Sequence, residues 1–105
     1  MTDHIQVTTA TPSKEHAEQT ADALIERRLA ACVQIVGPIK SVYRWQGKIE
    51  SGEEWLCVAK TRRELYDQVE AAIRELHPYD EPEIIATEIV AGSRGYLDWI
   101  DRETR

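Results

Sequence analysis

Two adjacent β-type stretches, longer than the helices expected beside them, constrain this fold most. Residues 32–45 are rich in Val and Ile and are interrupted by Gly37 and Pro38. Residues 48–61 resume the strand pattern after Gln46 and Gly47. A two-residue turn containing glycine predicts a β-hairpin, which the Gly-Pro pair should bend or bulge. A strand of about 13 residues reaches about 43 Å, whereas a helix of roughly 16 residues spans about 24 Å. We therefore expect the hairpin to extend beyond the core.

The segments around the hairpin carry strand and helix periods in a fixed order. Residues 4–9 alternate apolar and polar, and residues 83–90 are rich in isoleucine, so both are predicted strands. A first helix should begin at Ser13, with one apolar face made of Ala17, Ala21, Leu24, Ile25 and Leu29. Thr61 and Glu64 have capping-box spacing for a second helix, which Pro78 ends, and residues 96–104 predict a short third helix.

The order βαββαβ, followed by a terminal helix, is the split βαβ arrangement of a ferredoxin-like α+β sandwich. Two helices should cover one face of a four-stranded antiparallel sheet, with an extended hairpin and a short C-terminal helix. At 105 residues the chain fits a single domain spanning residues 1–105.

Charge and composition limit which partners are expected. The chain has 19 acidic and 13 basic residues and a net charge of -6, so nucleic acid and anionic membranes are not expected partners. No secretory leader or membrane-spanning run is apparent, which favours the cytoplasm. Cys32 and Cys57 lie in apolar stretches without a CxxC motif and are expected to be buried free thiols.

The hairpin should carry apolar side chains that two helices cannot cover. These are Val42, Tyr43, Trp45 and Ile49. Exposed apolar strands favour pairing with another copy, so we expect a homo-oligomer about a symmetry axis. The alternative is a hairpin that folds back on its own monomer.

Few residues suggest chemistry on their own. His77 stands before Pro78 at the end of the second helix, where its ring could hold a metal or small ligand, or cap the helix. Glu54 and Lys60 should share one strand face and line a pocket, or else form a solvated edge. Asp80 and Glu81 look like ordinary loop residues. No nucleophile elbow, phosphate loop or HExxH motif is present, so an enzyme is not expected.

Four blocks, AACVQIVGPIKSVYRWQGKIES, EEWLCVAKT, HPYDEPEII and YLDWI, taken in this order, resemble the CutA family of divalent-cation tolerance proteins. The resemblance implies a non-enzymatic, ferredoxin-like protomer that forms a homotrimer, with hairpins crossing between subunits. It also implies a role in tolerance of copper and other divalent metal ions.

The resemblance further implies site residues. Proposed copper ligands of some members correspond to Thr9, Leu76 and His77, so His77 alone remains as a metal ligand. We expect no required cofactor and only weakly bound Cu(II). Glu54, Lys60 and Tyr79 should line a ligand cleft between subunits, with Tyr43, Trp45 and Trp99 at the trimer interface. Alternatively, Glu54 and Lys60 form ion pairs that lock the trimer.

Two other functions stay open. Nitrogen-regulatory signalling proteins are also trimers of ferredoxin-like subunits with ligand clefts between protomers, which suggests a small-molecule sensor in which Lys60 meets an anion. The third is a scaffold that anchors a protein partner.

Overall fold

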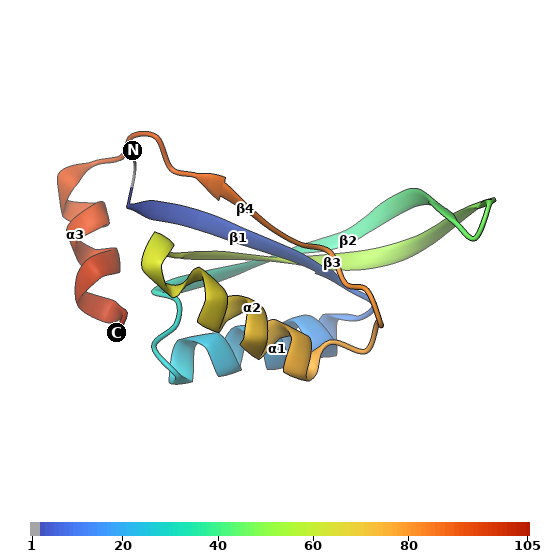
Figure 1. Cartoon of the computed structure of the whole chain (residues 1–105), viewed down its shortest axis with the longest axis horizontal. Helices are drawn as coiled ribbons and strands as arrows, with labels where there is room; N and C mark the ends of the chain where they lie inside the picture. The colour runs from blue at the N-terminus through green and yellow to red at the C-terminus, as the bar shows by residue number, and fades with distance from the viewer. Residues whose placement is uncertain (1–2) are drawn as a thin grey trace.

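The computed structural model describes residues 3–105, which form one twisted sheet with two helices on one face (Figure 1). The strands are β1 (His4–Thr11), β2 (Cys32–Trp45), β3 (Lys48–Arg62) and β4 (Ile84–Glu88). The helices are α1 (Lys14–Glu26), the short 3-10 helix η1 (Arg63–Leu65), α2 (Tyr66–Leu76) and α3 (Arg94–Glu103). The ferredoxin-like α+β prediction is confirmed.

The sheet has the order β2-β3-β1-β4, and all its pairs are antiparallel. Gln46 and Gly47 have φ values of 52° and 79°, the positive values that a tight type I′ hairpin turn requires. The predicted irregularity at Gly37 and Pro38 is present, because the β2–β3 register shifts between Val36 and Ile39. A Cβ at position 37 would lie 2.6 Å from Cε3 of Trp55, so any larger residue there would force that ring to shift.

The core lies between the sheet and the pair of helices α1 and α2. Its central side chains come from β1, β3 and both helices, and they are Val7, Leu24, Ala59, Val69 and Ile73. Ser13 caps α1 as predicted, since its side chain accepts a hydrogen bond from the backbone N–H of His16 at 3.1 Å. The core therefore covers one face of the sheet only.

Helix α3 packs across the end of the sheet where β1 begins and β3 ends (Figure 1). Nε2 of His4 in β1 lies 2.9 Å from Oδ1 of Asp101. Nε of Arg62 in β3 donates to the hydroxyl of Thr104 at 2.8 Å. Ile100 of α3 is fully buried. The tail helix thus closes this end of the domain, while the hairpin extends from the opposite end.

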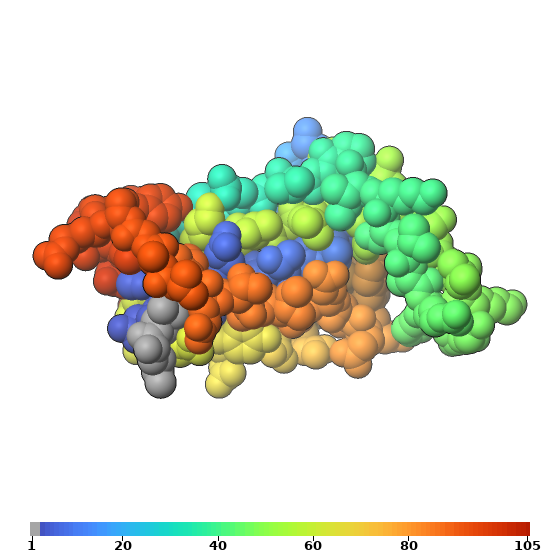
Figure 2. All heavy atoms as spheres, turned by 90° about the horizontal axis from the view of Figure 1, so that it is seen from above, coloured from blue at the N-terminus to red at the C-terminus, as the bar shows by residue number. Residues whose placement is uncertain are grey.

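The hairpin and the sheet face opposite the helices remain open (Figure 2). Val42, Trp45 and Ile49 on the hairpin are 64%, 53% and 68% exposed, and Val36 and Ile85 on the open face are also exposed. The predicted overhang is therefore present, and within the protomer its apolar side chains stay accessible to solvent.

Two details of the sequence prediction are wrong. The hydroxyl of Thr61 is buried and donates to the carbonyl oxygen of Leu29 at 2.6 Å, while Glu64 pairs with Arg62, so no capping box forms. Helix α2 instead follows η1, without a side-chain cap. The first helix also ends at Glu26, which places Leu29 beyond it and leaves Ile25 exposed rather than in the core.

Candidate functional site

His77 ties the loop after α2 to the first strand. Its Nε2 lies 2.7 Å from the carbonyl oxygen of Ala10, and its Nδ1 lies 3.2 Å from the backbone nitrogen of Tyr79. A carbonyl can only accept, so Nε2 carries the proton and Nδ1 accepts from the Tyr79 N–H. The backbone N–H of His77 donates to the carbonyl oxygen of Ile73 at 2.9 Å and closes the last turn of α2. The ring itself does not cap the helix. The tether fixes the start of the loop over residues 78–83.

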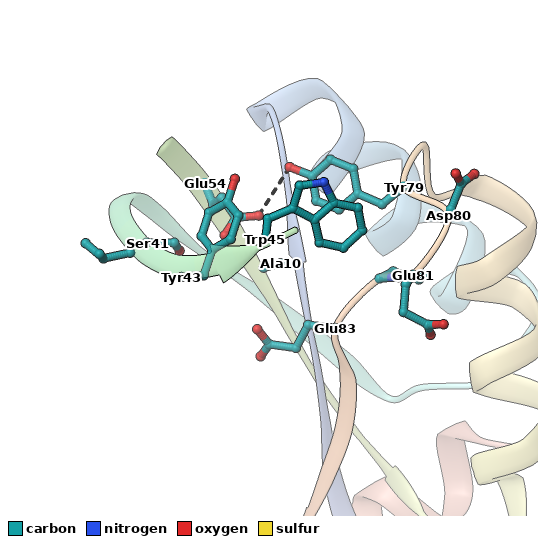
Figure 3. Close-up of a pocket in the computed structure, with 11 residues that line it drawn as sticks. Ala10, Ser41, Tyr43, Trp45, Glu54, Tyr79, Asp80, Glu81 and Glu83 are labelled. Carbon is teal, nitrogen blue, oxygen red and sulfur yellow. Dashed lines mark hydrogen bonds between the residues drawn. The ribbon is translucent and has the colours of Figure 1, made fainter. Parts of the chain in front are cut away.

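A cleft of about 630 Å³ lies between this loop and the hairpin (Figures 2 and 3). The hairpin supplies Tyr43 and Trp45, and the loop supplies Tyr79. Apolar side chains complete its walls, and four carboxylates also line it. These lining residues are Ala10, Val42 and Pro82, and Glu54, Asp80, Glu81 and Glu83.

The cleft carries negative charge. The Tyr79 hydroxyl donates to Oε2 of Glu54 at 3.3 Å, and burial together with the Glu54 carboxylate raises the pKa of Tyr79. Glu81 lies 3.6 Å from the guanidinium of Arg74, outside the cleft. Among residues 3–105, no lysine, arginine or histidine lines the cleft, and no ion pair neutralises Glu54, Asp80 or Glu83. The arrangement suits a positively charged ligand better than an anion.

Within one protomer, the structure brings together only part of the predicted site. Glu54, Tyr79, Tyr43 and Trp45 meet at the cleft, whereas Lys60 lies farther along β3 and donates to Oε1 of Gln34. A cleft between subunits that joins Glu54, Lys60 and Tyr79 stays a prediction.

Trp99 is half-buried on α3, with its ring centroid 5.4 Å from that of Tyr96. It stands at the opposite end of the sheet from Tyr43 and Trp45 (Figure 1). The three predicted interface residues therefore form two separate patches, and their contacts with other subunits remain a prediction.

Sequence reasoning missed the acidic wall of the cleft. Asp80 and Glu81 were expected to be ordinary loop residues, yet they line the cleft with Glu83. Their concentration between Pro78 and Ile84 is visible in the sequence. What the sequence does not give is the twist of the hairpin, which brings Tyr43 and Trp45 over this loop.

Both cysteines are free thiols, as expected. Cys57 is 1% exposed and donates to the carbonyl oxygen of Ala17 at 3.3 Å, and burial raises its pKa to about 11. Cys32 is only half-buried, contrary to expectation. Neither thiol joins a metal centre: in the described part of the chain, no three His, Cys, Asp or Glu side chains cluster in a way that could hold a metal ion.

Comparison with known proteins places these features in a family. Residues 5–103 match the family model described as CutA1 divalent ion tolerance protein. A divalent-cation tolerance protein CutA of Thermus thermophilus is 45% identical over 93 residues, covering 89% of this chain and 90% of that protein. The solved structure titled as the periplasmic divalent cation tolerance protein CutA of Archaeoglobus fulgidus superposes with a TM-score of 0.94 at 41% identity, covering 97% of this chain and 99% of that one.

Relatives differ in length and in the compartment their names give. The protein CutA, chloroplastic, of Arabidopsis thaliana is 41% identical over 101 residues, which cover 96% of this chain but 56% of that protein. Its name and the periplasmic name of the Archaeoglobus protein mean that the cytoplasmic location of this chain stays a prediction. Over residues 3–105, none of the helices has the length and apolar character needed to cross a membrane.

Proposed function

Because the chain belongs to the CutA family of divalent-cation tolerance proteins, we propose that it acts in this tolerance as a non-enzymatic homotrimer that binds Cu(II) weakly. The ion is a cargo rather than a resident cofactor, and we propose that it is bound in the cytoplasm. The proposed ligand is His77, together with nearby carboxylate or carbonyl oxygens.

The two contacts of the His77 ring, with the carbonyl oxygen of Ala10 and the backbone nitrogen of Tyr79, carry the copper proposal. Metal-bound histidines usually donate their second ring N–H to a carbonyl or carboxylate, which fixes the ring and raises the basicity of the ligating nitrogen. The 2.7 Å contact of Nε2 with Ala10 supplies this partner, and Nδ1 then has a lone pair directed towards the Tyr79 N–H. Cu(II) would replace that long hydrogen bond. One imidazole with oxygen ligands supports weak binding, because copper has the highest affinity of the first-row divalent ions for such donors.

The homotrimer proposal is supported by two apolar patches at opposite ends of the protomer. Tyr43 and Trp45 lie on the hairpin, and Trp99 lies on α3. A closed ring of three subunits uses a heterologous contact, in which one patch meets a different patch on the next copy. The two patches lie at opposite ends of the sheet, which suits such a contact. The open sheet face, with Val36 and Ile85 exposed, would supply additional contact area.

The copper test is isothermal titration of the purified protein with Cu(II), with Zn(II) as a comparison metal. His77→Gln is the informative variant, because an amide N–H can still donate to Ala10 while the imidazole is lost. We expect a saturable site near one per chain that His77→Gln removes. His4→Gln and His16→Gln are matched controls and should retain it. An unchanged Cu(II) affinity in His77→Gln would show that the assignment of His77 is wrong.

A second candidate, a trimeric small-molecule sensor, is favoured by the cleft between the hairpin and residues 78–83. Its volume of about 630 Å³ falls within the range of about 300–1,000 Å³ typical of small-molecule sites. A thermal-shift screen of nucleotides, carboxylates and amines tests it, since a ligand specific to the native state raises the melting temperature. A screen in which no metabolite raises the melting temperature would count against a sensor.

A further inference from the structure

We propose that the groove between helix α1 and strand β2 docks a basic amphipathic helix of a partner protein. The groove has a volume of about 420 Å³, and it is lined by carboxylates of α1 and by apolar side chains of both elements. The proposal goes beyond tolerance of divalent cations and gives a docking surface to the scaffold function that the sequence left open. It rests on neither the copper site nor the cleft beside residues 78–83.

The groove lies on the side of the sheet that the proposed subunit contacts do not use. Val33 of β2 pairs in register with Ala59, and Ile35 pairs with Cys57. Ala59 and Cys57 are buried on the helix side of the sheet, and side chains paired across strands share a face, so Val33 and Ile35 also point to that side. Figure 1 shows α1 on this side and apart from the tip of the hairpin. The contacts assigned to a trimer involve the hairpin, α3 and the opposite face.

The apolar walls explain an isoleucine that the core does not use. Ile25 of α1 is 43% exposed, whereas the adjacent Leu24 is 1% exposed. Ile25 lines the groove together with Val33 and Ile35, which are half-buried. An apolar groove of this kind receives side chains spaced three or four residues apart on an amphipathic helix. The three residues therefore form the apolar part of a docking surface.

The carboxylates supply charge complementarity. Glu18, Asp22 and Glu26 line the same groove and follow one another at intervals of four residues, a rise of about 6 Å for each step along α1. All three are exposed, and within residues 3–105 none of them forms an ion pair. Like charges at this spacing repel each other and destabilise a helix. A cationic partner would relieve this repulsion.

Charge and spacing together select the occupant. Lysines or arginines four residues apart on a docked helix are also separated by a rise of about 6 Å, so they can meet successive carboxylates of α1. The apolar stripe of the same helix then covers Ile25, Val33 and Ile35. Nucleic acids and anionic membranes would be repelled by these carboxylates. The partner is therefore a cationic helix with one apolar stripe.

The test uses a fluorescent peptide of about 18 residues, whose leucines form one helical stripe flanked by lysines. One control peptide has the same composition in scrambled order, and the other has glutamates in place of the lysines. Each is titrated into the assembled full-length protein and followed by fluorescence anisotropy. We expect the ordered basic peptide to bind at least about tenfold more tightly than either control, and its affinity to fall as salt is added.

Variants locate the site. The double variant Asp22→Asn, Glu26→Gln should weaken peptide binding about tenfold, and Ile25→Ala should weaken it about threefold to tenfold. The matched control is Asp67→Asn, Glu103→Gln. It removes the same two kinds of charge from exposed positions outside the groove, where neither residue forms an ion pair within residues 3–105. Sizing and circular dichroism of each variant check that fold and assembly are unchanged.

Three outcomes would overturn the proposal. They are equal binding of the ordered and scrambled peptides, equal effects of the groove double variant and its matched control, and no binding of the ordered peptide to the assembled protein. If the peptide does not bind and the groove double variant lowers the mass of the assembly, the groove belongs to a contact between copies. The Cu(II) titration is scored separately, through His77→Gln.

Discussion

The two ends of strand β3 have the same backbone conformation and opposite surroundings. At its C-terminal end, Cys57, Ala59 and Thr61 face the helices and are at most 1% exposed. At its N-terminal end, on the hairpin, Ile49 is 68% exposed although it is the larger side chain. Alternation along a strand decides which side chains share a face, but a second layer decides whether that face is buried. Helices α1 and α2 supply this layer at one end only.

The difference teaches which apolar residues serve the protomer and which serve a partner. Burying an isoleucine side chain contributes roughly 1.5–3 kcal/mol, and the exposed hairpin side chains gain little of this within one chain. Several large apolar side chains exposed on one hairpin are typical of an interaction site. We therefore expect substitutions at the covered end to affect folding and those at the hairpin to affect association.

The largest expected effect is at the core. Ile73→Ala should lower the free energy of unfolding by about 2–5 kcal/mol, because Ile73 is 1% exposed and its loss leaves a cavity. Chemical denaturation monitored by circular dichroism measures it. Ile49→Ala is the matched change on the hairpin, and it should act mainly through the dependence of the unfolding midpoint on protein concentration. A loss below about 1 kcal/mol for Ile73→Ala would contradict the assigned core.

Next in size is the pH dependence of the covered thiol. The folded pKa of Cys57 is about 11, above its ordinary value of 9.0, so the unfolded chain ionises first as the pH rises. The contribution of the neutral Cys57 thiol to the free energy of unfolding is present in full below pH 9 and is lost towards pH 11. The total loss is roughly 2–3 kcal/mol.

Unfolding measured across this pH window in wild type and Cys57→Ala checks the prediction. As the pH rises, the free energy of unfolding should fall less steeply in Cys57→Ala than in wild type. Cys32→Ala should keep the wild-type slope, because Cys57 is still present. Identical slopes in wild type and Cys57→Ala would contradict the buried placement of this thiol.

The smallest expected effect lies at the junction between the core and the hairpin. Gly37→Ala should cost about 1–3 kcal/mol, because its Cβ would fall 2.6 Å from the Trp55 ring and the ring must shift. Gly52→Ala, farther out on the hairpin, meets nothing within 4 Å and should change stability little. Denaturation of the two variants side by side provides the measurement. Equal costs would remove the distinction between the packed junction and the open hairpin.

The fold followed from sequence because its signals are local. Period-2 alternation around Ile5 and Val7, the Gln46–Gly47 turn and the Gly37–Pro38 bulge all appear where predicted. Thr61 shows where local rules fail. Its capping-box spacing was real, but the buried carbonyl of Leu29 takes its hydroxyl, and the helix begins later. A buried acceptor from a distant segment outweighed a short-range pattern.

The candidate site was only partly predictable, because it joins segments far apart in the chain. Glu54 was named from strand spacing and again from the resemblance to the CutA family, Tyr79 from the resemblance alone, and the two side chains do meet. The contact of His77 with Ala10 spans 67 positions, and no periodicity predicts such a pair. The position of Lys60 shows the same limit, since strand alternation gives its face but not its distance from the cleft.

Sedimentation equilibrium of the full-length chain tests the central claim, that the hairpin end is covered by other copies. The wild-type protein should give three times the chain mass of 12.0 kDa. Ile49→Asp, which places a charge where the side chain is 68% exposed in the protomer, should lower that mass while retaining the circular dichroism of the native fold. A wild-type mass of 12.0 kDa over the whole concentration range would contradict the account.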